Sequence, residues 1–374
     1  MTGRPLSFDI FCRIIDNLGD AGVCWRLARQ LVRHPAVNGP VRLWVDRLEV
    51  LRTLEPAVMT DALQQHCDGV DIIHWHDSAP DLEPHAIVIE TFACDPPARF
   101  LAHMQRGRHC WISLDYLSAE PWVDTAHLRA SLFAGGQRRW FFFPGFTPAS
   151  GGLLREPGLL ARRDTWQADA GARPRLLRAL GLSADDVALA NAGAAVVLLF
   201  AYPQAPVDAL IHALESQDRP CLLLIPQGLY PGLIRPDGAA LRVRRIPFLR
   251  QDDFDTLLWS CDLNIVRGED SMVRALWAGR ALIWQAYVQD ADAHLDKLEA
   301  WLGHSALPAQ AQDVMRAWNR LDGAATQQGL ASLIAPARLE EWGQACRRWS
   351  ARLSRQTDLV QRLLAFCAQG AHKA

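Results

Sequence analysis

Residues 8–25, FDIFCRIIDNLGDAGVCW, decide the fold that we predict for this chain of 374 residues. Residues 8–15 are mostly apolar and β-branched at their end, which is typical of a buried strand. Turn-forming residues follow, and Asp20 is a suitable N-cap for a helix over residues 21–33. Asp16 and Asp20 therefore lie in the loop that joins the first strand to the first helix. In open α/β sheets, ligands bind at this carboxyl end of the strands.

Short apolar stretches alternate with helical segments along the rest of the chain. We expect further strands at residues 41–45, 70–75, 86–91, 110–114, 139–143, within 187–201, and at 221–225, 243–247, 263–266 and 282–284. This alternation predicts an α/β fold with parallel, doubly wound sheets. Residues 144–174 contain many Pro and Gly residues, which is typical of a domain boundary. We therefore predict two α/β domains in tandem, followed by a helical tail.

The composition excludes several classes of function. Half of the residues are hydrophobic and the formal net charge is -2, so there is no electrostatic case for binding nucleic acid or an acidic membrane surface. No apolar run approaches the roughly 20 residues of a membrane span. The first residues lack the apolar core and cleavage site of a signal peptide, so we expect none.

The nine cysteines indicate a reducing environment. They are scattered, odd in number and never spaced as C-x-x-C. A disulfide framework or a zinc cluster is therefore not expected, and the cytoplasm is the natural setting. His74 and His76 share one face of an expected strand, but no carboxylate-rich motif accompanies them. We expect no metal site.

Asp16 and Asp20 are the first candidates for chemistry. One carboxylate at the mouth of a strand-to-helix loop acts as a general base, while a second orients the acceptor or tunes the first. The alternative is that Asp16 opens a turn and Asp20 caps a helix. The sequence has no G-x-G-x-x-G motif after the first strand and no Walker A lysine loop, which disfavours a nicotinamide dinucleotide or a P-loop site.

Residues 264–271, NIVRGEDS, form the second candidate. A strand ends here, Gly268 permits close approach of the backbone, and a helix begins. Free N–H groups at a helix start attract phosphate, and Arg267 is placed to add a charge-assisted contact. Glu269 and Asp270 suit a ligand that also carries sugar hydroxyls. The alternative is a capped helix whose acidic first turn simply complements the helix dipole.

Aromatic residues at expected strand exits form the third candidate. A nucleobase requires a flat apolar slot with a few polar groups, and Gln251 is available to provide one. Aromatic side chains at strand ends also commonly belong to the core, so that alternative stays open. The candidates in this group are Phe200, Tyr202, Phe248 and Tyr287.

Four stretches give the chain a family resemblance: FCRIIDNLGDAGVCWRLARQL, LDYLSAEPWV, FFFPGFTPASGGLLRE and VRGEDSMVRALWAGRALIWQAY. In this order, from about residue 8 to about residue 300, the chain resembles the bacterial protein-arginine rhamnosyltransferases that modify translation elongation factor P. The resemblance implies a GT-B fold, with two Rossmann-like domains that face each other across a cleft. It also implies an inverting transfer of L-rhamnose from dTDP-β-L-rhamnose to one arginine of elongation factor P, with no cofactor or metal ion.

The resemblance also assigns roles to the domains. It implies that residues 1–165 form the N-terminal, acceptor-side Rossmann-like domain and that residues 175–350 form the nucleotide-sugar domain. Residues 351–374 would form a helix that packs back towards the N-terminal domain. The acidic loop and the Arg-Gly-Glu-Asp-Ser corner are then expected to face each other across the activated sugar.

By position, Asp20 matches the family's general base, Asp16 its neighbouring carboxylate, and Glu269 an acidic residue needed for activity. The expected donor-binding residues match the family positions at the diphosphate, the sugar and the thymidine, and Gly19 in the first turn is included with them. They are Arg267, Asp270, Ser271, Phe248, Gln251, Tyr287, Phe200, Tyr202 and Gly19.

Two other functions stay open from the residues alone. One is a GT-B glycosyltransferase with a different acceptor, such as a small molecule or a lipid. The other is a protein that binds a sugar nucleotide without turnover. The pair of carboxylates in a cleft loop disfavours the second alternative.

Overall fold

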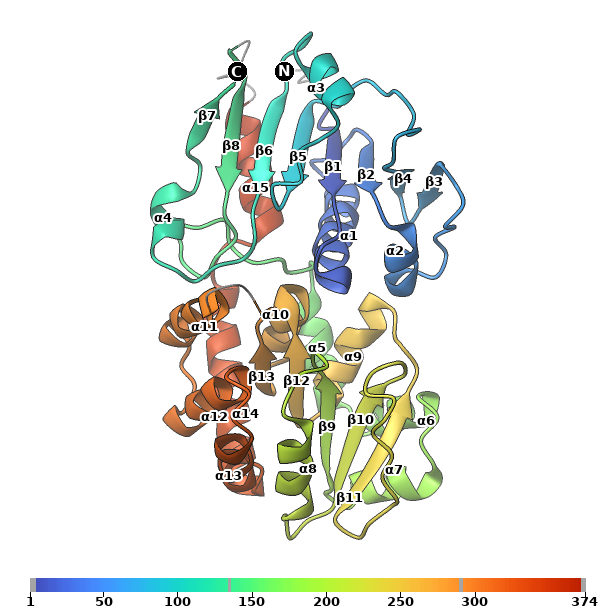
Figure 1. Cartoon of the computed structure of the whole chain (residues 1–374), viewed down its shortest axis with the longest axis vertical. Coiled ribbons are helices and arrows are strands. Elements are labelled where there is room, and N and C mark those ends of the chain that lie inside the picture. The colour runs from blue at the N-terminus through green and yellow to red at the C-terminus, as the bar shows by residue number, and fades with distance from the viewer. Residues whose placement is uncertain (1–4, 134–135, 289–291, 371–374) are drawn as a thin grey trace. The chain divides into compact units, whose positions relative to one another are not determined.

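The computed structural model describes residues 5–133, 136–288 and 292–370 (Figure 1). The chain divides into two compact units. Unit 1 comprises Met1–Glu156 together with Gln356–Ala374, and unit 2 comprises Pro157–Arg355. Each unit contains a sheet with helices around it, as expected for an α/β chain.

The sheet of unit 1 is mainly parallel and has the strand order β3-β4-β2-β1-β5-β6-β8-β7. Its edge strands β3 and β7 run antiparallel to their neighbours, and neither was expected from the sequence. The strands are β1 (Phe8–Cys12), β2 (Val41–Val45), β3 (Gln64–Cys67), β4 (Val70–His74), β5 (Ile87–Thr91), β6 (Cys110–Leu114), β7 (Ala130–Leu132) and β8 (Arg138–Phe142).

Helices cover both faces of this sheet. The helices of unit 1 are α1 (Asn17–Arg33), α2 (Leu48–Leu54), α3 (Ala98–Met104), α4 (Trp122–Ala126) and α15 (Leu359–Gly370). Alternate residues of β1 point to opposite faces. Phe8, Ile10 and Cys12 belong to a buried cluster that contains residues of α1, α2 and α15, the red helix beside the sheet in Figure 1. Phe11 belongs to a second cluster, to which α3 contributes Phe100.

The sheet of unit 2 is parallel throughout its described pairs, with the order β11-β10-β9-β12-β13. Four of its strands are apolar and buried along most of their length, which is typical of a sheet covered on both faces. The strands are β9 (Ala195–Phe200), β10 (Cys221–Pro226), β11 (Leu241–Ile246), β12 (Leu263–Arg267) and β13 (Ala281–Gln285).

The helices of unit 2 follow the same alternation and then continue without strands after β13. They are α5 (Leu159–Ala168), α6 (Ala172–Ala179), α7 (Ala184–Asn191), α8 (Val207–Glu215), α9 (Gln251–Ser260), α10 (Gly268–Ala278), α11 (Ala293–His304), α12 (Ala309–Asn319), α13 (Gly323–Leu333) and α14 (Pro336–Ser354). Helix α7 occupies the first part of the apolar run 187–201, so the strand β9 is confined to its second part.

The division between the units lies at Glu156 and Pro157, before the limit of 165 that the sequence suggested. Helix α5 lies within the stretch 144–174 that was expected to hold the domain boundary, and its side chains form hydrogen bonds with other elements of unit 2. The Arg163 guanidinium donates to the Trp277 carbonyl at 2.7 Å, and the Trp166 indole donates to the Ser260 hydroxyl at 2.9 Å. Unit 2 likewise extends past 350 because α14 continues to Ser354. Residues 371–374 of the expected tail lie outside the described residues.

Within the described part of the chain, none of the helices combines the length and the apolar character that crossing a bilayer requires.

Candidate functional site

The loop after β1 places Asp16 and Asp20 at the carboxyl end of the unit 1 sheet. Helix α1 begins at Asn17, earlier than expected, and Asp16 occupies the N-cap position without a side-chain cap hydrogen bond. Asp20 therefore lies inside the first turn of α1, and its expected role as the N-cap was wrong. The helix starts earlier because residues 17–19 adopt helical geometry instead of forming an open turn.

The Asp20 carboxylate folds back onto the loop. Its Oδ2 atom accepts hydrogen bonds from the backbone N–H groups of Ile15 at 2.8 Å and Asp16 at 2.9 Å. The residue is 2% exposed. This burial raises the pKa of Asp20, while the two backbone N–H groups, the Tyr116 hydroxyl and the charge of Arg47 act in the opposite direction. A carboxylate with a raised pKa has the character of a general base.

Tyr116 is a residue of this site that the sequence did not single out. Its hydroxyl hydrogen bonds to the Asp20 carboxylate. Its ring stacks on Phe92, with ring centroids 4.2 Å apart and an angle of 14° between the planes. Tyr116 lies in the stretch LDYLSAEPWV, which carried part of the family resemblance, and that stretch was the available signal.

Gly19 has a steric reason to lack a side chain. A Cβ atom at this position would lie 2.6 Å from Oδ2 of Asp16, well inside van der Waals contact. The N–H of Gly19 donates to the backbone carbonyl of Asp16 at 2.8 Å. Glycine at this position therefore leaves room for the Asp16 carboxylate over the first turn of α1.

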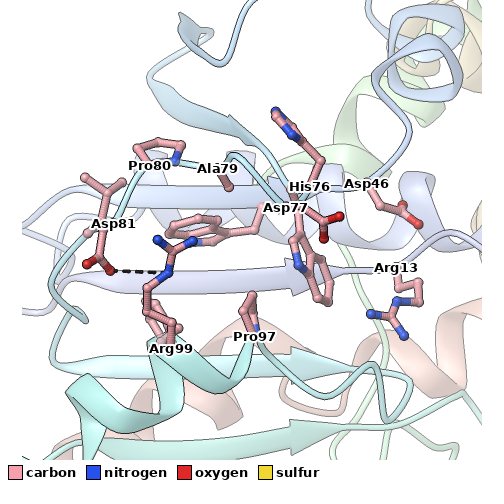
Figure 2. Close-up of a pocket in the computed structure, with 13 residues that line it drawn as sticks. Arg13, Asp46, His76, Asp77, Ala79, Pro80, Asp81, Pro97 and Arg99 are labelled. Atoms are coloured by element: carbon pink, nitrogen blue, oxygen red, sulfur yellow. Dashed lines mark ion pairs between the residues drawn. The ribbon is translucent and has the colours of Figure 1, made fainter.

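A pocket of about 380 Å³ adjoins the same loop (Figure 2). The Arg13 guanidinium lies over the Trp75 ring, 4.9 Å from its centroid. Asp46, on the pocket wall, accepts a 2.9 Å hydrogen bond from the backbone N–H of Ile14. Asp46 thus belongs both to the pocket wall and to the support of the acidic loop. Other lining residues include Trp44, His76, Asp77, Asp81, Arg99 and Phe100.

In unit 2, the end of β12 and the start of α10 bring several predicted residues together. Gly268 adopts a φ of 68°, a conformation that favours glycine. The preceding Arg267 places its guanidinium over the rings of Phe200 and Tyr202, 5.0 Å from each centroid. The chain at this corner therefore presents a cation in contact with two aromatic faces.

The other predicted aromatic residues join the same cluster. Phe248 lies edge-on to Phe200, with centroids 6.2 Å apart, and Tyr287 lies edge-on to Tyr202 at 5.7 Å. Phe200 and Tyr202 are buried, whereas Tyr287 is 46% exposed. The structure thus places all four predicted aromatic residues and Arg267 in one group at the carboxyl end of the unit 2 sheet.

Asp270 and Gln251 belong to a buried ion cluster. The Asp270 carboxylate accepts from Nε of Arg274 at 3.0 Å and from the Gln251 amide at 3.2 Å. Arg274 also donates to Asp255 at 2.9 Å. All four residues are buried, and they join α9 to α10. Contact of Asp270 and Gln251 with the donor stays a prediction.

Glu269 lies half-buried in the first turn of α10 and forms an ion pair with Lys297 of α11. Lys297 had no expected role, although it is one of only two lysines in an arginine-rich chain. Ser271 follows in the same turn and is half-buried. Among the residues that the structure describes, no group of three or more His, Cys, Asp or Glu side chains is arranged to hold a metal ion. The expected independence from metal stays a prediction.

Comparison with known proteins gives a consistent result. The family model described as Elongation-Factor P (EF-P) rhamnosyltransferase EarP matches residues 8–368. The chain is 43% identical to a protein-arginine rhamnosyltransferase from Pseudomonas putida, over 96% of this chain and 98% of that protein. It is 41% identical to the protein-arginine rhamnosyltransferase of Pseudomonas aeruginosa, over 97% and 99% of the two chains.

Solved structures agree on the fold. One described as the structural basis for EarP-mediated arginine glycosylation of translation elongation factor EF-P is 34% identical, with a TM-score of 0.62 over 97% of this chain and 99% of that chain. The spinosyn rhamnosyltransferase SpnG, complexed with thymidine diphosphate, is 12% identical, with a TM-score of 0.52 over 96% and 100% of the two chains. The expected α/β fold of the GT-B type is confirmed.

Proposed function

The chain belongs to the EarP family of elongation factor P rhamnosyltransferases and is a glycosyltransferase, and from this premise we propose its donor, its acceptor and the roles of its residues. The donor is dTDP-β-L-rhamnose, and the acceptor is one arginine side chain of elongation factor P. The product is an α-linked rhamnosyl-arginine, formed with inversion. The observation that carries this proposal is the buried Asp20 carboxylate, whose pKa burial raises, at the loop after β1.

The acceptor poses a chemical problem. A guanidinium stays protonated in protein settings, so its nitrogens have no free lone pair with which to attack a sugar. Asp16 and Asp20 answer this need because two carboxylates hold a guanidinium through charge-assisted hydrogen bonds. Such bonds to chosen N–H groups localise the π-electrons and leave one terminal nitrogen more nucleophilic.

A terminal nitrogen of the arginine attacks C1 of rhamnose, and the bond between C1 and the diphosphate oxygen breaks. The attacking nitrogen gives one proton to Asp20, and dTDP leaves with the bonding electron pair. The raised pKa of Asp20 favours acceptance of this proton. Asp16 orients the acceptor.

Unit 2 binds the donor in this proposal. The aromatic group around Arg267 receives the thymidine, and Arg267 with the first-turn N–H groups of α10 stabilises the departing diphosphate. Glu269 binds sugar hydroxyls, and Lys297 holds its carboxylate in place. Asp270 and Gln251 support this corner through the ion cluster with Arg274.

Nucleotide selectivity tests the assigned donor, and dependence of turnover on elongation factor P tests the assigned acceptor. A ligand that binds only the native state raises the thermal midpoint. We expect dTDP to raise the midpoint of the wild-type protein more than UDP or GDP at equal concentration. Release of dTDP from dTDP-rhamnose should then require elongation factor P. A preference for UDP or GDP would contradict the assigned donor, and donor turnover that ignores elongation factor P would contradict the assigned acceptor.

A further inference from the structure

A basic pocket lies at the amino ends of the strands in unit 2. It has a volume of about 220 Å³ and is lined by four arginines from four different segments. Arg173 comes from α6, Arg219 precedes β10, Arg280 precedes β13 and Arg347 comes from α14. Its acidic lining residues are Asp262 and Glu340.

This pocket is separate from the candidate donor site. The strands of the unit 2 sheet run parallel, so their amino ends share one edge and their carboxyl ends the other (Figure 1). Ala195 and Ala281 begin β9 and β13 near the pocket, whereas Phe200 and Arg267 end β9 and β12 in the aromatic group. A strand of five residues spans roughly 17 Å, so the pocket and the aromatic group are separated by a distance of about this size.

The charges of the pocket do not balance. Arginine stays protonated, so four guanidinium groups meet two carboxylates. Asp262 is already committed, because it pairs with Arg173 at 2.7 Å and accepts from the backbone N–H of Val196 at 2.9 Å. Burial lowers the pKa of Arg280, Asp262 opposes this, and the nearby charges of Arg347 and Arg173 lower the pKa further. An anion between these groups would relieve their mutual repulsion.

Two of the arginines that line the pocket each have an N–H group without a hydrogen-bond acceptor in the described part of the chain. The Nε atoms of Arg173 and Arg219 are buried and have no hydrogen-bond partner among the described residues. Arg219 uses another nitrogen to donate to the Ile334 carbonyl at 3.1 Å. Buried donors are usually satisfied in folded proteins, so these unpaired N–H groups leave the positive charge of the pocket arginines without full compensation inside the protein.

We propose that this pocket binds a phosphate dianion, either as inorganic phosphate or as the phosphate group of a small monoester. Guanidinium groups match phosphate in both charge and geometry. The excess of two positive charges equals the charge of the dianion. The pocket volume is several times the approximately 30 Å³ that one water occupies in the liquid, which leaves room for a small organic group.

Isothermal titration in phosphate-free buffer tests the proposal, with inorganic phosphate, glucose 1-phosphate and glucose as three separate probes. We expect saturable binding of inorganic phosphate by the wild-type protein and none of glucose. Equal affinities for the two phosphates would assign the site to phosphate itself, and tighter binding of glucose 1-phosphate would assign it to a monoester. Binding of glucose alone, or of no probe, would overturn the proposal.

Matched variants locate the binding. Arg347→Gln and Arg219→Gln should each weaken phosphate affinity about tenfold through loss of a charge-assisted contact. Arg348→Gln, at the next residue of α14 and outside the pocket lining, should bind as the wild type does. Arg267→Ala should also keep phosphate affinity, because Arg267 lies in the candidate donor site. Unchanged affinity in both pocket variants, or loss of affinity in Arg267→Ala, would overturn the assignment.

Discussion

The Asp20 carboxylate accepts a 2.9 Å hydrogen bond from the backbone N–H of Asp16. The side chain of one predicted catalytic residue therefore fixes the main chain of the other. Together with the contacts of Ile15 to Asp20 and of Ile14 to Asp46, this bond means that carboxylates bind three consecutive loop N–H groups. Carboxylates therefore hold the loop in place, and one of them, Asp20, is also the proposed general base.

The Tyr116 hydroxyl is one of the groups that lower the pKa of Asp20. Burial raises the pKa of Asp20, and the Tyr116 hydroxyl partly offsets that effect. Activity should therefore fall as the pH drops through the raised pKa, because the base becomes protonated. In Tyr116→Phe the offset is lost, so we expect the acid limb of kcat/KM to move to higher pH, as measured over a pH series.

Phenylalanine keeps the ring that stacks on Phe92, so the fold should be unaffected. Asp20→Asn provides a second check through stability. A carboxyl whose pKa is raised in the folded state loses stabilising free energy as the pH rises through that pKa. The wild-type free energy of unfolding should show this slope, and Asp20→Asn should lack it. An acid limb that stays in place in Tyr116→Phe would contradict the assignment of Asp20 as the base.

Gly19 is expected to act through the position of the Asp16 carboxylate. In Gly19→Ala the new Cβ would require Asp16 Oδ2 to move, since the two atoms would otherwise lie 2.6 Å apart. We expect kcat to fall about tenfold or more, because small misplacements of catalytic groups are costly. The thermal shift caused by dTDP should be unchanged, and that result would remove Gly19 from the donor-binding residues expected from the family resemblance. Gly303→Ala on α11, where an added Cβ meets nothing within 4 Å, is the matched control. Equal turnover by the two variants would rule out this role for Gly19.

The acidic loop shows how far sequence reasoning extends. The apolar run at residues 8–15 predicted a strand, and turn chemistry predicted a helix after it, so the location of the two carboxylates followed. The contacts of Asp20 could not be predicted in the same way. The preference of aspartate for N-cap positions is a statistical tendency, and it does not say which groups one particular carboxylate contacts. One of the contacts of Asp20 is with Tyr116, which is 96 residues away in the sequence and is brought near only by the fold.

Other differences have equally specific causes. The Pro- and Gly-rich stretch 144–174 predicted a domain boundary, and the division at Glu156 and Pro157 lies within it, but helix α5 at the end of this stretch was not predicted. Strand β3, QQHC, has almost no apolar residues to mark it, and it forms by antiparallel pairing with β4. The ion pair of Glu269 with Lys297 joins helices α10 and α11. The sequence of neither helix shows which of its residues will face the other helix, so this pair could not be predicted.

Glu269 is expected to act on the sugar and not on the nucleotide. Glu269→Gln should lower kcat about 10²–10³-fold if its charge contacts the sugar in the transition state. Binding of dTDP alone, measured by thermal shift, should be unchanged. Lys297→Met should lower kcat by a smaller factor, because it removes the partner that holds the carboxylate, and Lys297→Arg should restore most of the loss. Normal turnover by Glu269→Gln would leave this residue only a structural role.

Asp270 should matter mainly for stability. Its removal leaves the buried charge of Arg274 with one carboxylate fewer, and breaking a buried pair typically costs about 3–5 kcal/mol. Asp270→Ala should lower the free energy of unfolding by such an amount in a denaturant titration. Asp253→Ala, at an exposed position in the first turn of α9, should change it by about 0.5 kcal/mol or less. Equal free energies of unfolding for Asp270→Ala and Asp253→Ala would show that the ion cluster around Asp270 does not stabilise the fold.

The intact mass of elongation factor P after incubation with the protein and dTDP-rhamnose tests the central claim most directly. The wild-type protein should add the mass of one deoxyhexosyl residue, and an acceptor whose target arginine is replaced by lysine should stay unmodified. Asp20→Asn, matched in fold by its thermal midpoint, should modify the acceptor about 10²–10⁴-fold more slowly. An unmodified acceptor with the wild-type protein, or an Asp20→Asn rate equal to that of the wild type, would contradict the account.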